Sequence, residues 1–346
     1  MKKVVSLLLL SAVFALAYPL LKDAFTSGGS LSYDDEQQTL DQKITLRFSH
    51  VVAENTPKGL AAQRFAELVH QKTEGRVQVE LYQNGILYND DTELEALKNG
   101  KVEMIAPSYS RLTDLVPAWK VLDLPFIFRD SAHAQSVLTG SMRDPLLQML
   151  DEKGIRGLAF WSNGFKQMTS RYKLLMKPED FKGLTFRTMP GEVIANQFQL
   201  LQAQTVVTPF NEVYRSLASR RIDGQENTVS NIYSKRLYQV QKSLTITNHG
   251  YLGYVVIVNE KFWEGLPKDL RSLILEALQE TTAWNMNTAK NMNERQLNDI
   301  RRRSPITIHE LTEREKQEWQ RRFTPLYRKI EHEVGGKWID RIKHQR

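Results

Sequence analysis

Alternating apolar and polar residues predict an α/β fold in the first part of the chain. Strand-like alternation occurs around Ile44 and again around Val79. Between them Thr56-Pro57 begins an amphipathic helix, since proline suits the first helical position. The expected elements run strand, helix, strand, helix, strand, at 44–48, 56–75, 77–81, 93–98 and 102–106. This order predicts a parallel sheet with helices on both faces.

The remainder of the chain continues the alternation of strands and helices. Phe210–Ser219 is expected to form a helix, and Ile222-Asp223-Gly224 a short strand with a turn. Further apolar strands are expected at 155–161, 184–189 and 252–258. The fold class expected overall is α/β.

A run without proline or glycine extends from Lys268 to Ser304. As a single helix it would be ~55 Å long, enough to brace two domains. Two helices with an unmarked break are the alternative. The residues after this run form an amphipathic, arginine-rich helical segment.

Residues 1–17 have the pattern of a secretory signal peptide. Two lysines precede a short apolar stretch that ends in Ala-Leu-Ala, a typical cleavage context. Residues 18–21 extend the apolar stretch, so an uncleaved membrane anchor is the alternative. Residues 18–43 are expected to be a flexible linker. The body of the chain is therefore expected outside the cytoplasm.

Composition narrows the chemistry further. The chain has 346 residues, enough for roughly two domains, and a net charge of +7. It contains no cysteine, which excludes disulfides, thiolate metal sites and thiol nucleophiles. The seven histidines show no helical metal spacing, and no phosphate-binding or nucleophile-elbow motif occurs. The sequence therefore predicts no metal, no cofactor and no catalytic residue.

Two basic runs, Arg301-Arg302-Arg303 and Arg321-Arg322, raise the question of a nucleic-acid or membrane surface. Several glutamates between residues 310 and 318 balance these charges. We therefore expect a solvated helix face and no nucleic-acid partner.

Seven short segments, in order along the chain, resemble one protein family. They are FSHVVAENTPKG at 48–59, DLPF at 123–126, NGFKQM at 163–168, FKGLTFR at 181–187, FNEVY at 210–214, DGQEN at 223–227 and NHGYLGY at 248–254. Together they resemble the extracytoplasmic solute-binding proteins of TRAP transporters, of the dicarboxylate-binding DctP type. The resemblance covers roughly residues 44–340.

This resemblance implies a two-domain, hinged fold of the periplasmic-binding-protein kind, with parallel or mixed sheets and a long helix bridging both domains. The first domain would hold 44–162 and about 251–285. The second would hold 163–250 and about 286–346. The ligand would bind in the cleft between them.

The resemblance makes Arg187 the arginine that clamps a ligand carboxylate, a role that suits a planar, permanently charged guanidinium. Strand alternation alone would turn Arg187 away from Phe186 and leave it on the surface. Lys166 would bind the second carboxylate; its alternative is a solvated lysine.

Four further residues are expected at the ligand site by the same resemblance. Asn227 would hydrogen-bond the ligand, although an asparagine after Asp-Gly is also common in turns. Phe210 would form a wall of the cleft or simply belong to the core. His249 would line the site or be a hydrogen-bonded core histidine, and Ser108 is a candidate from the first domain. At Thr228 the chain has threonine where the family usually has proline.

The function that follows is capture of a small dicarboxylate, of the succinate, malate or fumarate class, for delivery to TRAP membrane permease subunits. The protein would be a periplasmic monomer and not an enzyme. A ligand-sensing subunit for a receptor kinase is the main alternative, and an exported acid-processing enzyme is another.

Overall fold

The computed structural model describes residues 43–345, and the expected signal peptide and most of the expected linker lie outside this range. Within it the strands form one mixed sheet in the order β2-β1-β3-β8-β4-β7-β5-β6, with β9 also paired to β8. The strands are β1 (Ile44–Ser49), β2 (Val77–Tyr82), β3 (Met104–Ile105), β4 (Ile155–Ser170), β5 (Thr185–Thr188), β6 (Gln204–Val207), β7 (Gly224–Thr228), β8 (Ser243–Asn259) and β9 (Thr307–Glu310). The predicted α/β class is confirmed.

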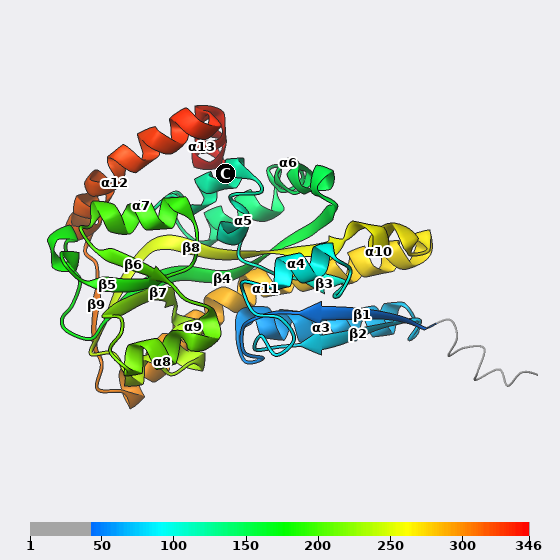
Figure 1. The fold of residues 1–346 in the computed structure, drawn as a ribbon, viewed down its shortest axis with the longest axis horizontal. Helices are drawn as coiled ribbons and strands as arrows, with labels where there is room; N and C mark the ends of the chain where they lie inside the picture. The colour runs from blue at the N-terminus through cyan, green and yellow to red at the C-terminus, as the bar shows by residue number, and fades with distance from the viewer. Residues whose placement is uncertain (1–42, 346) are drawn as a thin grey trace, which may run out of the picture. The chain divides into compact units, whose positions relative to one another are not determined.

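Helices cover the sheet and fill the connections between strands (Figure 1). They are α3 (Pro57–Lys72), α4 (Glu93–Lys98), α5 (Ser131–Thr139), α6 (Arg143–Leu147), α7 (Glu192–Leu200), α8 (Val213–Ala218), α9 (Val229–Ser234), α10 (Glu260–Gly265), α11 (Lys268–Arg303), α12 (Glu313–Val334) and α13 (Gly336–His344). In the residues described, no helix has the length and apolar character needed to cross a membrane.

The first part of the sheet follows the predicted element order, with one difference. β1 pairs in parallel with β3, as expected, but β3 then pairs antiparallel with β8. Thr56 caps α3 through its side chain, which accepts a hydrogen bond from the Gly59 amide. The sheet is therefore mixed, because a strand from late in the chain inserts next to the early βαβ unit.

Two long antiparallel strands, β4 and β8, run side by side through the centre of the sheet (Figure 1). They have 16 and 17 residues, well beyond the apolar stretches that predicted them. Their register shifts between Ser162 and Gly164 and again between Lys166 and Met168. These irregularities mark where the ladder is locally distorted.

The run without proline or glycine forms a single helix, α11, of 36 residues, so the two-helix alternative is wrong. It packs against α3, β4 and α9. Its Asn285 side chain binds both the amide and the carbonyl of Ser162, and Asn293 binds the Asn163 carbonyl and the Ser230 amide. α11 is thus fastened to β4 at Ser162 and Asn163, where the register of the β4–β8 ladder shifts.

Candidate functional site

One buried cluster of charged residues lies where β4, β7 and β8 adjoin. The Lys166 ammonium donates to Glu226 Oε1 at 2.8 Å, and His249 Nε2 lies 2.8 Å from Glu226 Oε2. Thr247 Oγ1 lies 2.7 Å from His249 Nδ1. Lys166 is only 1% exposed, so the solvated-lysine alternative is wrong. We call Lys166, Glu226 and His249 the Glu226 cluster.

The charges within the Glu226 cluster balance one another. Burial by itself would raise the pKa of Glu226, but Lys166 and His249 outweigh it and lower that pKa to about 2. Burial lowers the pKa of His249, which favours a neutral imidazole that donates from Nε2 to Glu226. One cation, one anion and one neutral ring thus satisfy each other without a ligand.

Gly250 makes room for this arrangement. A Cβ atom at Gly250 would lie 2.6 Å from Lys166 Cε, closer than such atoms approach in proteins. Lys166 and Gly250 are directly opposite each other in the β4–β8 ladder. The absence of a side chain at Gly250 therefore leaves room for the Lys166 stem beside β8.

Arg187 presents a different situation on β5. Its neighbour Phe186 packs into an aromatic group with Phe181 and Phe198, while Arg187 itself is 1% exposed. The expectation of a surface arginine is therefore wrong. The Nε and Nη2 groups both donate to the Thr208 carbonyl, at 2.9 and 2.7 Å. No carboxylate among residues 43–345 lies within 4.0 Å of this guanidinium.

Because an arginine has five N–H donors, Thr208 satisfies only part of the Arg187 guanidinium. Burial lowers the pKa of Arg187, yet a guanidinium stays protonated at physiological pH. The structure therefore places in the interior a positive charge with free donors, which no carboxylate of the described residues contacts directly. That combination is suited to binding a carboxylate.

Phe210 and an acidic side chain lie near Arg187. The Phe210 amide donates to Asp90 Oδ2 at 2.8 Å, and Arg111 lies 3.5 Å from Asp90 Oδ1. Asp90 is among the charges that act on Arg187. The Phe210 ring is buried and carries the Lys235 ammonium 5.4 Å from its centroid. Asp90 is thus held by Arg111 and by the chain at Phe210.

Asn227 lies within β7 and not in a turn, so the turn alternative is wrong. Its Oδ1 accepts from Asn231 Nδ2 at 2.7 Å and from the Thr228 amide at 3.0 Å. In the part of the chain described, its Nδ2 has no recorded acceptor. Thr228 caps α9 with its side chain, which explains how the chain begins that helix without the proline common in the family.

Ser108 is buried, and its main chain forms an isolated bridge with Tyr254 on β8. Its hydroxyl makes no recorded hydrogen bond within residues 43–345. The six predicted residues therefore fall into three groups. Lys166 and His249 meet at Glu226, whereas Arg187 and Phe210 share the neighbourhood of Asp90. Ser108 pairs with Tyr254 through its main chain, and Asn227 binds Asn231, which contacts Tyr254.

A second set of buried polar groups was not predicted from the sequence. Lys58 and Glu93 are both 0% exposed. The Lys58 ammonium donates to the Ala106 carbonyl at 2.8 Å and lies 3.7 Å from the centre of the Tyr254 ring. Both carboxyl oxygens of Glu93, and both ring nitrogens of buried His50, lack a partner in the described residues. We call Lys58, Glu93 and His50 the Lys58 cluster.

Burial dominates the acid–base properties of the Lys58 cluster. It raises the pKa of Glu93 to about 8 and lowers that of Lys58 to about 8. Burial and the Lys58 charge together lower the pKa of His50 to about 3. Burial thus favours the protonated acid at Glu93 and the neutral ring at His50. A sequence signal did exist, because a lysine in the first turn of a helix opposes the helix dipole.

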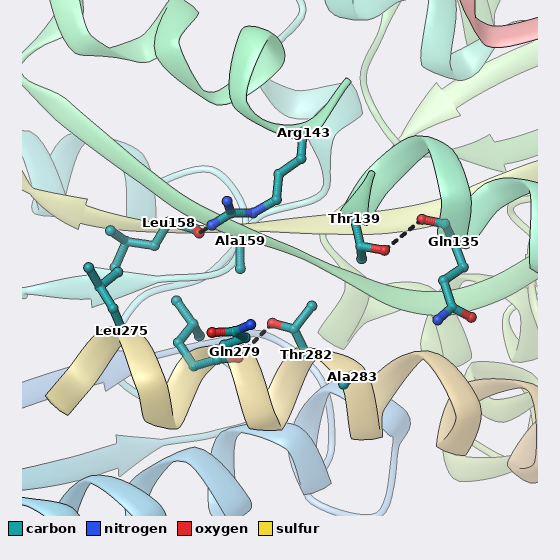
Figure 2. A pocket seen from close by; sticks show the side chains of 10 residues that line it. Gln135, Thr139, Arg143, Leu158, Ala159, Leu275, Gln279, Thr282 and Ala283 are labelled. Atoms are coloured by element: carbon teal, nitrogen blue, oxygen red, sulfur yellow. Dashed lines mark hydrogen bonds between the residues drawn. The ribbon is translucent and has the colours of Figure 1, made fainter. Parts of the chain in front are cut away.

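The described residues contain no metal site at these groups, and the cavity in Figure 2 lies elsewhere. Residues 43–345 contain no group of three or more His, Asp or Glu side chains that could hold a metal ion. Figure 2 shows a cavity of about 430 Å³ between α5, α6, β4 and α11, lined by residues such as Arg143 and Thr282. None of the predicted site residues lines that cavity.

Comparisons with known proteins identify relatives over most of the chain. The model of the DctP family, bacterial extracellular solute-binding protein family 7, matches residues 48–333. The C4-dicarboxylate-binding protein DctB of Bacillus subtilis is 46% identical over 314 residues, 91% of this chain and 90% of that protein. The C4-dicarboxylate-binding periplasmic protein DctP of Rhodobacter capsulatus is 41% identical over 321 residues, 92% of this chain and 96% of that protein.

A solved structure agrees with this match. The TRAP periplasmic solute binding protein from Shewanella oneidensis, crystallised with bound succinate, is 39% identical and superimposes with a TM-score of 0.84. The similarity covers 87% of this chain and 98% of that one. With a family model that spans most of the chain and a fold that matches, the resemblance found in seven short segments is confirmed, and the chain belongs to the DctP family of extracellular solute-binding proteins.

Proposed function

We propose that this solute-binding protein captures a C4-dicarboxylate such as succinate, malate or fumarate and delivers it to a TRAP membrane permease. The names of its relatives and the succinate bound in its structural neighbour support this ligand class. The observation that carries the proposal is the buried Arg187, which has free donors and no carboxylate partner among the described residues.

Arg187 is proposed to bind one ligand carboxylate through its guanidinium fork. Such a pair is shorter and roughly twice as strong as a neutral hydrogen bond, and it fixes the orientation of the acid. Asn227 supplies a free amide donor, and Phe210 and Ser108 are proposed to line the same space. A micromolar dissociation constant, about −8 kcal/mol, is within reach of a few such contacts.

Lys166 needs a different description from the one expected. Its ammonium is bound to Glu226, so a ligand carboxylate at Lys166 would compete with a carboxylate already in place. We therefore propose that Lys166 and His249 hold the Glu226 carboxylate at the edge of the site. The second ligand carboxylate then needs another cationic partner.

The division into two domains is retained as a proposal. The predicted boundaries, after Ser162 and after Gly250, lie close together in the β4–β8 ladder, where the register shifts. Gly164, between these shifts, has a φ of +102°, which favours glycine. A bend at this position would let the two parts close on the ligand and exclude water, which strengthens each ion pair.

The cellular setting follows from the family and is proposed in the same way. An extracellular solute-binding protein with a signal-like N-terminus would act in the periplasm and meet permease subunits at the membrane. Binding without turnover is the activity expected of the family, in place of the acid-processing enzyme considered above.

The proposal is tested by calorimetry and thermal unfolding with succinate, L-malate and fumarate, beside butyrate as a monocarboxylate of equal length. At 100 times its dissociation constant a ligand adds about 2.7 kcal/mol of stability, which shifts the midpoint by a few degrees. We expect shifts with the dicarboxylates and unchanged ligand after binding, as checked by NMR. If none of the three dicarboxylates raises the unfolding midpoint, the proposal is contradicted. Turnover of the bound acid would favour an enzyme.

A further inference from the structure

The second carboxylate of a dicarboxylate needs its own cationic partner, and the interior offers a choice between two lysines. Lys166 and Lys58 are both buried. Lys166 is bound to Glu226 at 2.8 Å, whereas no carboxylate among residues 43–345 lies within 4.0 Å of the Lys58 ammonium. Only Lys58 therefore resembles Arg187 in having a charge that the described protein leaves unpaired.

Lys58 and Arg187 have neighbours in common. The Lys58 ammonium lies over the Tyr254 ring, and Tyr254 and Arg187 act on each other electrostatically. Asp90 acts on both cations, yet its own oxygens are taken by Arg111 and by the Phe210 amide. The two cations therefore border one region of the interior around Tyr254, in which Asp90 is already engaged.

The surroundings of Lys58 do not explain the lysine as a structural residue. It lies in the first turn of α3, where a positive charge opposes the helix dipole. Its ammonium makes one hydrogen bond, to the Ala106 carbonyl, although it has three donors. The nearby Glu93 has no hydrogen-bond partner at either oxygen, and burial raises its pKa, which favours the protonated acid. A buried ammonium without an anion is costly unless a ligand supplies one.

We propose that Lys58 is the second cationic anchor of the ligand site, binding the carboxylate at the opposite end from the one that Arg187 holds. This inference rests on the proposed function, since it assumes a dicarboxylate ligand. Glu93, beside Lys58 and without a partner, would donate a hydrogen bond to the same ligand carboxylate. Lys58 thereby becomes the residue that distinguishes dicarboxylates from monocarboxylates.

The test compares succinate with butyrate, which has a methyl group in place of the second carboxylate, by calorimetry on the full chain. In Lys58→Met we expect succinate affinity to fall by roughly 10- to 100-fold while butyrate affinity hardly changes, because only succinate loses an ion-paired hydrogen bond. Lys72→Met, on the same helix α3 and bound to Glu280 on α11, is the matched control and should leave both affinities unchanged. If Lys58→Met does not fold, Lys58→Gln keeps a donor for the Ala106 carbonyl and replaces it.

The competing assignment is tested with Lys166→Met/Glu226→Gln, which removes the lysine without leaving a buried unpaired carboxylate. Loss of succinate selectivity in this variant, with selectivity kept in Lys58→Met, would overturn the proposal in favour of Lys166. Unchanged selectivity in Lys58→Met would overturn it in any case. If the wild-type protein binds none of the dicarboxylates, it is the proposed function that fails, before Lys58 is put to the test.

Discussion

The interior contains two groups of buried charges that differ in whether the protein completes them. In the Glu226 cluster every charged group has a partner within 2.8 Å. Around Tyr254, Arg187 and Lys58 are equally buried, yet their hydrogen bonds go only to main-chain carbonyls. The charges of the Glu226 cluster are therefore paired without a ligand, whereas Arg187 and Lys58 would gain anionic partners only when a ligand binds.

This difference predicts opposite consequences for stability and binding. Removing one member of a completed buried pair strands its partner and destabilises the fold. Removing an uncompensated cation relieves the ligand-free protein of a desolvated charge, while it weakens the bound state. Binding sites commonly show this trade between stability and function.

The largest expected effect concerns the Glu226 cluster, in which every charged group has a partner. Lys166→Met leaves the Glu226 carboxylate buried with only His249, and should lower the free energy of unfolding by about 3–5 kcal/mol. Glu226→Gln added to it should recover most of that loss, since both charges are then gone. Urea unfolding of the ligand-free proteins measures both. Equal stability of wild type and Lys166→Met would mean that the two clusters do not differ in this way.

Next in size is the effect of Arg187→Ala on binding. Succinate affinity should fall by roughly 100-fold or more, because the ligand loses a charge-assisted, two-pronged contact. The stability of the ligand-free protein should stay the same or rise. Arg187→Lys keeps the charge but not the planar fork of donors, so its succinate affinity should lie between those of the wild type and Arg187→Ala. Calorimetry with wild-type affinity in Arg187→Ala would remove Arg187 from the site.

The pH dependence of stability distinguishes the two clusters by its sign. The pKa of Glu93 is raised from 4.5 to about 8. Unfolding therefore releases its proton between these values, and stability falls with rising pH by about 1.4 kcal/mol per unit. The pKa of Glu226 is lowered from 4.5 to about 2, so its contribution is present above pH 4.5 and is lost as the pH falls toward 2.

Difference measurements isolate these two carboxyl groups. The stability of wild type minus that of Glu93→Gln should decline from pH 5 to 7.5. The same difference for Glu226→Gln should decline from pH 4.5 downward. Denaturant unfolding across this range gives both curves, and the subtraction removes the contribution of His50. Parallel slopes for the two variants would contradict the assignment of opposite pKa shifts.

The smallest expected effect concerns Ser108. Because its hydroxyl makes no recorded bond in residues 43–345, Ser108→Ala should change stability by less than about 0.5 kcal/mol. Succinate affinity should fall by no more than a few-fold, the worth of one neutral hydrogen bond. A loss comparable to that of Arg187→Ala would show that Ser108 is a principal contact.

Much of the fold was predictable because local patterns and tertiary structure agree. Proline and glycine positions bracketed α3 and α11, and alternation located β1 and β2. The pattern failed where polar residues lie inside long strands. β4 continues through Ser162, Asn163 and Lys166, whose polar groups bind α11, α9 or Glu226. Such residues look like a loop until their distant partners are known.

The site was predictable to the extent that short segments resembled the family. Arg187 and Lys166 were found in this way, and their burial reversed what composition alone suggests. Whether each charge has a partner could not be read from the sequence, because Glu226 and Lys166 are 60 residues apart. Lys58 lies within the segment 48–59, but the sequence alone does not mark it as a site residue, because a lysine near a helix start is ordinarily solvated.

The attachment of α11 to β4 has a kinematic consequence. A helix of 36 residues is stiff along its axis, and Asn285 and Asn293 bind it to Ser162 and Asn163 of β4, at the register shift. If the two proposed domains slid along each other, the bonds from Asn285 and Asn293 to β4 would break. A rotation of the domains about these bonds would not need to break them. Spin labels at Ser272 and Asn298, at opposite ends of the helix, should therefore keep one separation with and without succinate. A changed separation would show that the rod itself bends, and that ligand capture is not a simple rotation.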